Sequence, residues 1–194
     1  MRQQPYIHGK YRNQEDKDIE GFRRYCEAFP KNNTVTAATV YGSEIDVVSS
    51  NETGGTILTE IKGRKWKSGF KDVMIEPAKL DCLERYWKEK GMWTFYLNLL
   101  EGTGTALLFF IPGITHLRKN FRFEKDYQIK WDGGTKIEDR YFIPVEYGYM
   151  IDLSTGEILS EAEKNESVPA PKAYDIPFGK GEITMTEIDQ ADER

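Results

Sequence analysis

Cysteine and histidine are both scarce in this sequence, with two residues of each among 194. Cys26 and Cys82 cannot build a disulfide framework, and both fall on or near apolar helix faces, so we expect buried, reduced thiols. His8 and His116 lack the spacing of a metal-binding pair. No apolar run approaches the roughly 18 residues of a membrane span, and residues 1–18 contain no apolar signal region. These absences predict a cytoplasmic protein without disulfides, a histidine-bound metal or a membrane anchor.

Charge is distributed unevenly along the chain, although the net value is only -5. Residues 157–194 contain 10 acidic and 4 basic residues, which leaves 23 basic and 22 acidic residues elsewhere. One segment, 62–71, carries five positive charges and no acidic residue. Local charge decides whether a polyanion is attracted, so the net negative charge does not exclude a nucleic-acid partner.

The pattern of the chain predicts an α+β protein with a mixed sheet flanked by helices. A first helix is expected from Asn13 to a stop at Pro30, and a second over 76–90, with Pro77 in its first turn and Gly91 after its last. The expected strands, bounded by glycine-rich turns, are 34–41, 44–50, 56–62, 93–100 and 105–111, with further strands between 121 and 153 around Asp132-Gly133-Gly134. We expect a single domain over 1–156, with a core at 13–111, a β-rich extension at 112–156 and an acidic, loosely ordered tail at 157–194.

Three charged residues stand out in the expected hairpin of strands 44–50 and 56–62. Glu60 and Lys62 point to one face of their strand, because side chains alternate. If the hairpin is symmetric about Thr53, Asp46 lies directly opposite Glu60, with Cβ atoms about 5 Å apart. Two adjacent carboxylates repel unless a cation lies between them, and Mg²⁺ prefers such oxygen ligands. The alternative without a catalytic role is an exposed cross-strand charge cluster on the polar face of a sheet.

Asp46 and the run Glu60-Ile61-Lys62 resemble the motif of the PD-(D/E)xK nuclease superfamily, which has a restriction endonuclease-like fold. Members share a helix, a three-stranded meander, a second helix and a further strand, and the resemblance covers about residues 13–111. Ile45 stands where the family nominally has proline. The resemblance implies hydrolysis of phosphodiester bonds with Mg²⁺ or Mn²⁺ held by Asp46 and Glu60. It also implies that Lys62 positions the attacking water and stabilises the phosphate.

Many members of this superfamily add a glutamate from the first helix. At 100° per residue, Glu15 lies on the apolar side of the expected helix, whereas Glu20 and Glu27 lie almost opposite it. Glu15 is therefore our expected fourth catalytic residue, and Glu20 is the second choice. The second helix often supplies an auxiliary polar residue, for which Lys79 is the candidate.

The basic segment 62–71 is expected to bind a nucleic-acid backbone without reading its sequence. The residues expected to do so are Arg64, Lys65, Lys67 and Lys71. Trp66 and Phe70 lie between them and either stack on bases or anchor the loop to the core. DNA is the expected partner, and a homodimer is left open because many nucleases cut two strands as dimers. Two other functions also stay open, namely a non-catalytic binding protein on the same fold and a protein-interaction module built on the aromatic-rich stretch 138–151.

Overall fold

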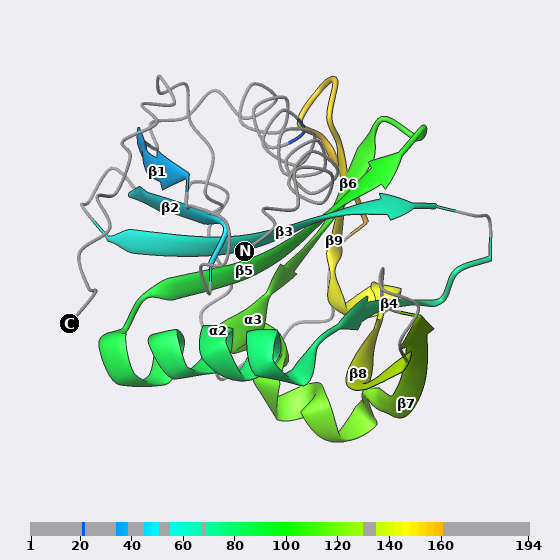
Figure 1. Cartoon of the computed structure of the whole chain (residues 1–194). Coiled ribbons are helices and arrows are strands. Elements are labelled where there is room, and N and C mark those ends of the chain that lie inside the picture. The colour runs from blue at the N-terminus through cyan, green and yellow to red at the C-terminus, as the bar shows by residue number, and fades with distance from the viewer. Residues whose placement is uncertain are drawn as a thin grey trace, which may run out of the picture.

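The computed structural model describes residues 21, 34–38, 45–50, 55–66, 69–129 and 135–160. Its main layer is a seven-stranded sheet in the order β1-β2-β3-β5-β6-β9-β10 (Figure 1). The strands of this sheet are β1 (Thr34–Ala38), β2 (Val47–Ser50), β3 (Thr56–Lys65), β5 (Trp93–Glu101), β6 (Thr105–Phe110), β9 (Tyr149–Asp152) and β10 (Ile158–Ser160). β3 and β5 are parallel and every other pair is antiparallel, so the predicted α+β class with a mixed sheet is confirmed.

The predicted hairpin of β2 and β3 forms in the predicted register, with Val47 opposite Thr59 and Ser50 opposite Thr56. Its strand ends differ from the prediction. β2 begins at Val47, so Asp46 lies just before the strand, and β3 continues to Lys65, three residues past the expected end. The extra length of β3 comes from its parallel pairing with β5, which runs without a break from Ile57 to Lys65.

A single long helix, α2 (Pro77–Lys90), connects the meander to the parallel strand β5. Pro77 fits the first position of the helix because it has no backbone N–H group that would need an acceptor there. Gly91 ends the helix in the left-handed conformation, with φ 66°. Parallel neighbours require such a crossover, because a tight turn cannot return the chain to the same end of the sheet. The order of meander, helix and further strand is the one that the nuclease resemblance implied.

The region after β6 contains the strands predicted between 121 and 153, but two of them belong to a second sheet that was not predicted. The short helices α3 (Ile111–Ile114) and η1 (Thr115–Asn120) lead to β7 (Arg122–Ile129) and β8 (Thr135–Pro144), and η2 (Val145–Tyr147) precedes β9. β7 and β8 form a second sheet in the order β4-β8-β7 with β4 (Asp72–Ile75), a strand that the sequence pattern did not predict. The expected core and the β-rich extension therefore contribute strands to the same sheets. β4 of the core pairs with β8 of the extension, and β9 of the extension lies beside β6 in the main sheet.

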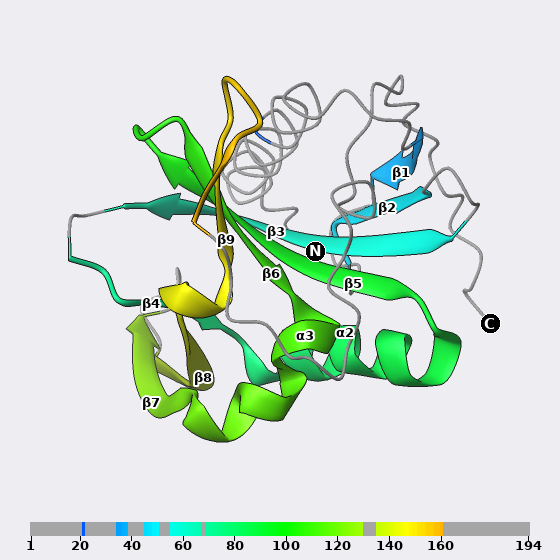
Figure 2. The same ribbon diagram turned by 180° about the vertical axis from the view of Figure 1, so that it is seen from behind.

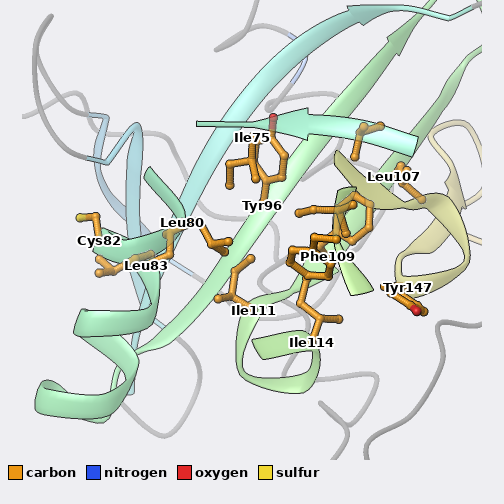
Figure 3. Close-up of a cluster of buried hydrophobic side chains, with 14 of the residues drawn as sticks. Ile75, Leu80, Cys82, Leu83, Tyr96, Leu107, Phe109, Ile111, Ile114 and Tyr147 are labelled. Carbon is orange, nitrogen blue, oxygen red and sulfur yellow. The ribbon is translucent and has the colours of Figure 1, made fainter. Parts of the chain in front are cut away.

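Two hydrophobic clusters cover the two faces of the main sheet. The larger one lies between the sheet, α2, α3 and the second sheet, and Figure 3 shows Leu80 and Leu83 of α2 pointing into it with Tyr96 and Phe109 of the sheet. Cys82 is buried in the same cluster and forms no disulfide with a described residue, as predicted. Figure 2 shows, from behind, that α2 and α3 share one side of the sheet.

The opposite face is lined by a cluster that includes Ile61, Leu97 and Leu99. Gly21 is helical and lies so close to Leu99 that a Cβ at position 21 would overlap the Leu99 side chain. The rest of the expected first helix, the Asp132-Gly133-Gly134 turn and residues 161–194 lie outside the described residues. β10 occupies the start of the segment predicted as a tail. Among the described residues, no helix is long and apolar enough to cross a membrane.

Candidate active site

Glu60 is the centre of the candidate site and is almost completely buried, with 1% of its surface exposed. Glu60 lies on β3, the third strand counted from the β1 edge of the main sheet. β2 and β5 are the neighbours of β3. Its side chain projects to the face covered by α2, where Lys79 donates a hydrogen bond of 3.1 Å from Nζ to Glu60 Oε2. The alternative of an exposed charge cluster is therefore wrong for Glu60.

Two ammonium groups flank the Glu60 carboxylate from different elements. Lys79 reaches the carboxylate from the first turn of α2. Lys62 lies two residues further along β3, and its Nζ is 3.9 Å from Glu60 Oε1. The Lys62 side chain is 42% exposed and that of Lys79 is 26% exposed. Lys62 is therefore accessible to a ligand from solvent, whereas Lys79 mainly neutralises and holds the buried carboxylate.

Asp46 approaches the same place from the position just before β2. Its Oδ2 accepts a hydrogen bond of 2.6 Å from the Ile61 backbone amide, which fixes the carboxylate beside β3. Its negative charge also acts on Glu60, as the pKa of that group shows. The structure thus brings Asp46, Glu60 and Lys62 together with Lys79, the auxiliary candidate from the second helix.

Burial and the neighbouring Asp46 charge raise the pKa of Glu60 from 4.5 to about 7. Burial is the larger cause, because a carboxylate removed from water loses its hydration. Lys79 and Lys62 act in the opposite direction but do not cancel the two raising effects. Burial and Asp46 disfavour the ionised form of Glu60, so a bound cation would stabilise that form near neutral pH.

The donor set fits Mg²⁺ or Mn²⁺. Glu60 Oε1 is buried and accepts no hydrogen bond, so one oxygen with a free lone pair lies beside a second carboxylate. Mg²⁺ commonly takes one or two carboxylates and completes its shell with water and substrate phosphate. Within the described ranges no group of three acidic, histidine or cysteine residues could hold a metal. Glu15 and Glu20, the predicted contributors from the first helix, lie outside those ranges.

Arg64 makes contacts that the sequence did not indicate. Its Nη2 donates to the Met74 carbonyl at 2.6 Å and to the Tyr96 hydroxyl at 2.8 Å, and its Nε donates to Asn98 Oδ1 at 3.3 Å. The Tyr96 hydroxyl itself donates to the Met74 carbonyl at 2.8 Å, and Figure 3 shows it directed at the strand that carries Ile75. Arg64 therefore links β3, β5 and β4 within the protein.

The sequence of β5 contains a signal for this hydrogen-bond network. Thr94, Tyr96 and Asn98 place polar atoms at every second position of an otherwise apolar strand, and all three are buried. Buried polar atoms need partners, so such a pattern indicates a polar network on one face of the strand. Burial raises the pKa of Tyr96 from 10.0 to about 12.

The other predicted nucleic-acid contacts lie near the connection between β3 and β4. Lys65 and Lys71 are exposed, and Lys67 lies outside the described residues. Figures 1 and 2 both place this connection at the end of the sheet away from the C-terminal end of α2.

The aromatic stretch 138–151 is largely internal. Tyr147 and Tyr149 are buried, and Tyr141 and Phe142 are half-buried. Tyr141 packs against Phe121 and Phe123, so the interpretation of these rings as packing residues is confirmed. Little aromatic surface is left there for the predicted interaction module.

Similarity to known proteins is found among solved structures alone. No protein-family model matches the sequence, and no curated protein matches it. Among solved structures, the chain is similar to Hjc, a Holliday junction resolvase from Archaeoglobus fulgidus, with 14% identity and a TM-score of 0.40. The match covers 77% of this chain and 98% of the resolvase chain.

Proposed function

We propose that this protein is a metal-dependent nuclease that hydrolyses phosphodiester bonds, with DNA as the expected substrate. The observation that carries the proposal is the convergence of Asp46, Glu60 and Lys62, with a buried Glu60 oxygen that accepts no hydrogen bond. Two carboxylates and a half-exposed ammonium are the groups needed to hold a divalent cation and a phosphate side by side.

Each residue has a separate part in this proposal. Asp46 and Glu60 hold Mg²⁺ or Mn²⁺, and the Ile61 amide and Lys79 keep the two carboxylates in place. When bound, the cation supplies charge neutralisation at the phosphate and a bound water of lowered pKa. Lys62 is accessible from solvent and stabilises charge on the phosphate or orients the water. Glu15 completes the site in the proposal, with Glu20 as the second choice.

Lys65, Lys67 and Lys71 are the proposed backbone contacts. Arg64 is reassigned to holding β3, β4 and β5 together, because its guanidinium donates inside the protein. A cytoplasmic location and a homodimer stay predictions of the sequence.

A non-catalytic nucleic-acid-binding protein on the same fold is the second candidate. The observation that favours it is the ion pair between Lys79 and Glu60, which neutralises the buried carboxylate without a metal. A requirement for metal separates the two functions, because a catalyst of this kind needs the cation and a binder does not.

The test is cleavage of labelled single-stranded, duplex, flapped and branched DNA, and of RNA, with Mg²⁺, Mn²⁺ or EDTA. Cleavage should need the metal. Asp46→Asn and Lys62→Met should each lower kcat by about 100-fold or more, since each removes a group that stabilises the transition state.

Two matched variants control for the loss of charge alone. Asp152→Asn alters a carboxylate that also accepts a backbone amide, and Lys88→Met alters a lysine that also pairs with a glutamate. Both lie outside the site and should cleave at the wild-type rate. Binding without cleavage of any substrate, unaffected by EDTA, would replace the nuclease with the non-catalytic binder.

A further inference from the structure

The connection between β3 and β4 presents an exposed aromatic side chain among positive charges. Phe70 is 46% exposed, and Lys65 and Lys71, five residues before it and one after it, are exposed as well. None of the contacts that define the candidate active site uses Phe70. Its position therefore calls for a separate explanation.

Phe70 rests on structured neighbours. Its ring centroid lies 5.7 Å from that of Trp66, and Trp66 packs against the larger hydrophobic cluster. On the far side, the Lys71 carbonyl accepts a hydrogen bond of 3.0 Å from the Val145 amide. Because its neighbours are already fixed, a ligand that stacks on Phe70 loses little free energy to ordering them.

A second phenylalanine is equally exposed but differs in its charged surroundings. Phe123 on β7 is 47% exposed. The cation next to it, Arg122, forms ion pairs with Asp72 and Glu124. The charge beside Phe123 is thus compensated within the protein, which gives a polyanion no reason to bind there.

The positive charge around Phe70 is much less compensated. Segment 62–71 contains no acidic residue. Glu101 is the register neighbour of Lys65 on β5. None of the ion pairs among the described residues involves Lys65 or Lys71. Aromatic rings among such cations are how proteins bind single-stranded nucleic acid, by stacking on bases and neutralising phosphates.

We propose that Phe70 stacks on an unpaired base of the nucleic acid whose phosphates lie along Lys65 and Lys71. A base inside a duplex is stacked on its neighbours, and inserting a ring beside it costs a few kcal/mol of unstacking, so an aromatic side chain stacks more favourably on an unpaired base. The substrate class is therefore DNA with unpaired nucleotides beside the cleaved strand. This inference rests on the proposed function for its nucleic-acid ligand, but it does not depend on catalysis.

The test measures binding in EDTA, where cleavage is not expected, by fluorescence anisotropy. The probes are a single-stranded oligonucleotide, its fully paired duplex with both ends closed by non-nucleotide linkers, and the same duplex with a central unpaired stretch. Phe70→Ala should raise Kd about tenfold for the two probes with unpaired bases and less than about twofold for the paired duplex. Phe70→Trp should bind like the wild type, because it keeps a ring.

Phe123→Ala is the matched control, since it removes an equally exposed ring, and it should change no Kd. Thermal unfolding of each variant shows whether the fold is intact. Equal weakening of all three probes by Phe70→Ala, or no weakening of any, would overturn the inference and leave Phe70 as a packing residue of the loop.

The two proposals fail in different ways. If the wild type binds unpaired DNA through Phe70 but cleaves nothing with Mg²⁺ or Mn²⁺, the nuclease proposal fails and this inference stands. If it cleaves DNA but Phe70→Ala binds normally, only this inference fails. Binding of no nucleic acid by the wild type would overturn both.

Discussion

Glu60 combines a structural cost with the part in metal binding that we propose for it. Its carboxyl is buried next to a second carboxylate, and both effects raise its pKa, while Lys79 and Lys62 lower it. The net pKa of about 7 means that the metal-free protein holds a proton on Glu60 in slightly acidic solution. A bound cation would replace that proton, so metal affinity should increase as pH rises.

The shifted pKa of Glu60 predicts how stability depends on pH without metal. Between 4.5 and about 7 the folded state binds more protons than the unfolded state, so the free energy of unfolding falls as pH rises. The full loss is about 3 kcal/mol, reached above pH 7. Urea unfolding in EDTA at pH 5, 6, 7 and 8 measures it. Glu60→Gln cannot ionise and should lack this decrease, whereas the same decrease in both proteins would contradict the assignment.

At the scale of elements, Arg64 connects the two sheets. It belongs to β3 of the main sheet, and its guanidinium donates to the Met74 carbonyl of β4, a strand of the second sheet. Asn98 and Tyr96 on β5 hold the same guanidinium from the side. Lys62 and the connection that carries Phe70 lie on either side of Arg64 along the chain.

Removing the Arg64 guanidinium should destabilise the contact between the sheets. Arg64→Leu deletes three donors to buried or half-buried acceptors, which should cost about 3 kcal/mol in the free energy of unfolding. Tyr96→Phe removes only the hydroxyl and should cost about 1 kcal/mol. Chemical unfolding measures both values. Faster amide exchange in β4 of Arg64→Leu would place the loss at this contact, and a cost below 1 kcal/mol for Arg64→Leu would show that the network contributes little.

At the scale of the whole molecule, the proposed metal site links binding to folding. Asp46 and Glu60 come from opposite sides of a hairpin and meet only when β2 and β3 pair. A ligand that binds only the folded state adds to its stability by mass action. The same reasoning applies to Mn²⁺, and calcium can serve as a cation that supports binding without supplying the same chemistry.

Mg²⁺ should therefore stabilise the wild type in proportion to its occupancy. At ten times its Kd the free energy of unfolding should rise by about 1.4 kcal/mol, and the rise should be larger at pH 8 than at pH 6 at one fixed Mg²⁺ concentration. Urea unfolding across a Mg²⁺ titration measures this. Asp46→Asn should show little rise, and an equal rise in that variant would indicate that Mg²⁺ binds elsewhere.

The sequence by itself determined the elements whose signals are local. Pro77 and Gly91 mark α2 within one residue, and the symmetric hairpin expected of strands 44–50 and 56–62 predicts the register in which β2 and β3 pair. The tertiary structure decided the rest. It buried Glu60 under α2, turned Arg64 inward and paired β4 with β8, a strand about 70 residues later in the chain. Burial and long-range pairing depend on which distant segments meet, and that information is not contained in the spacing of neighbouring residues.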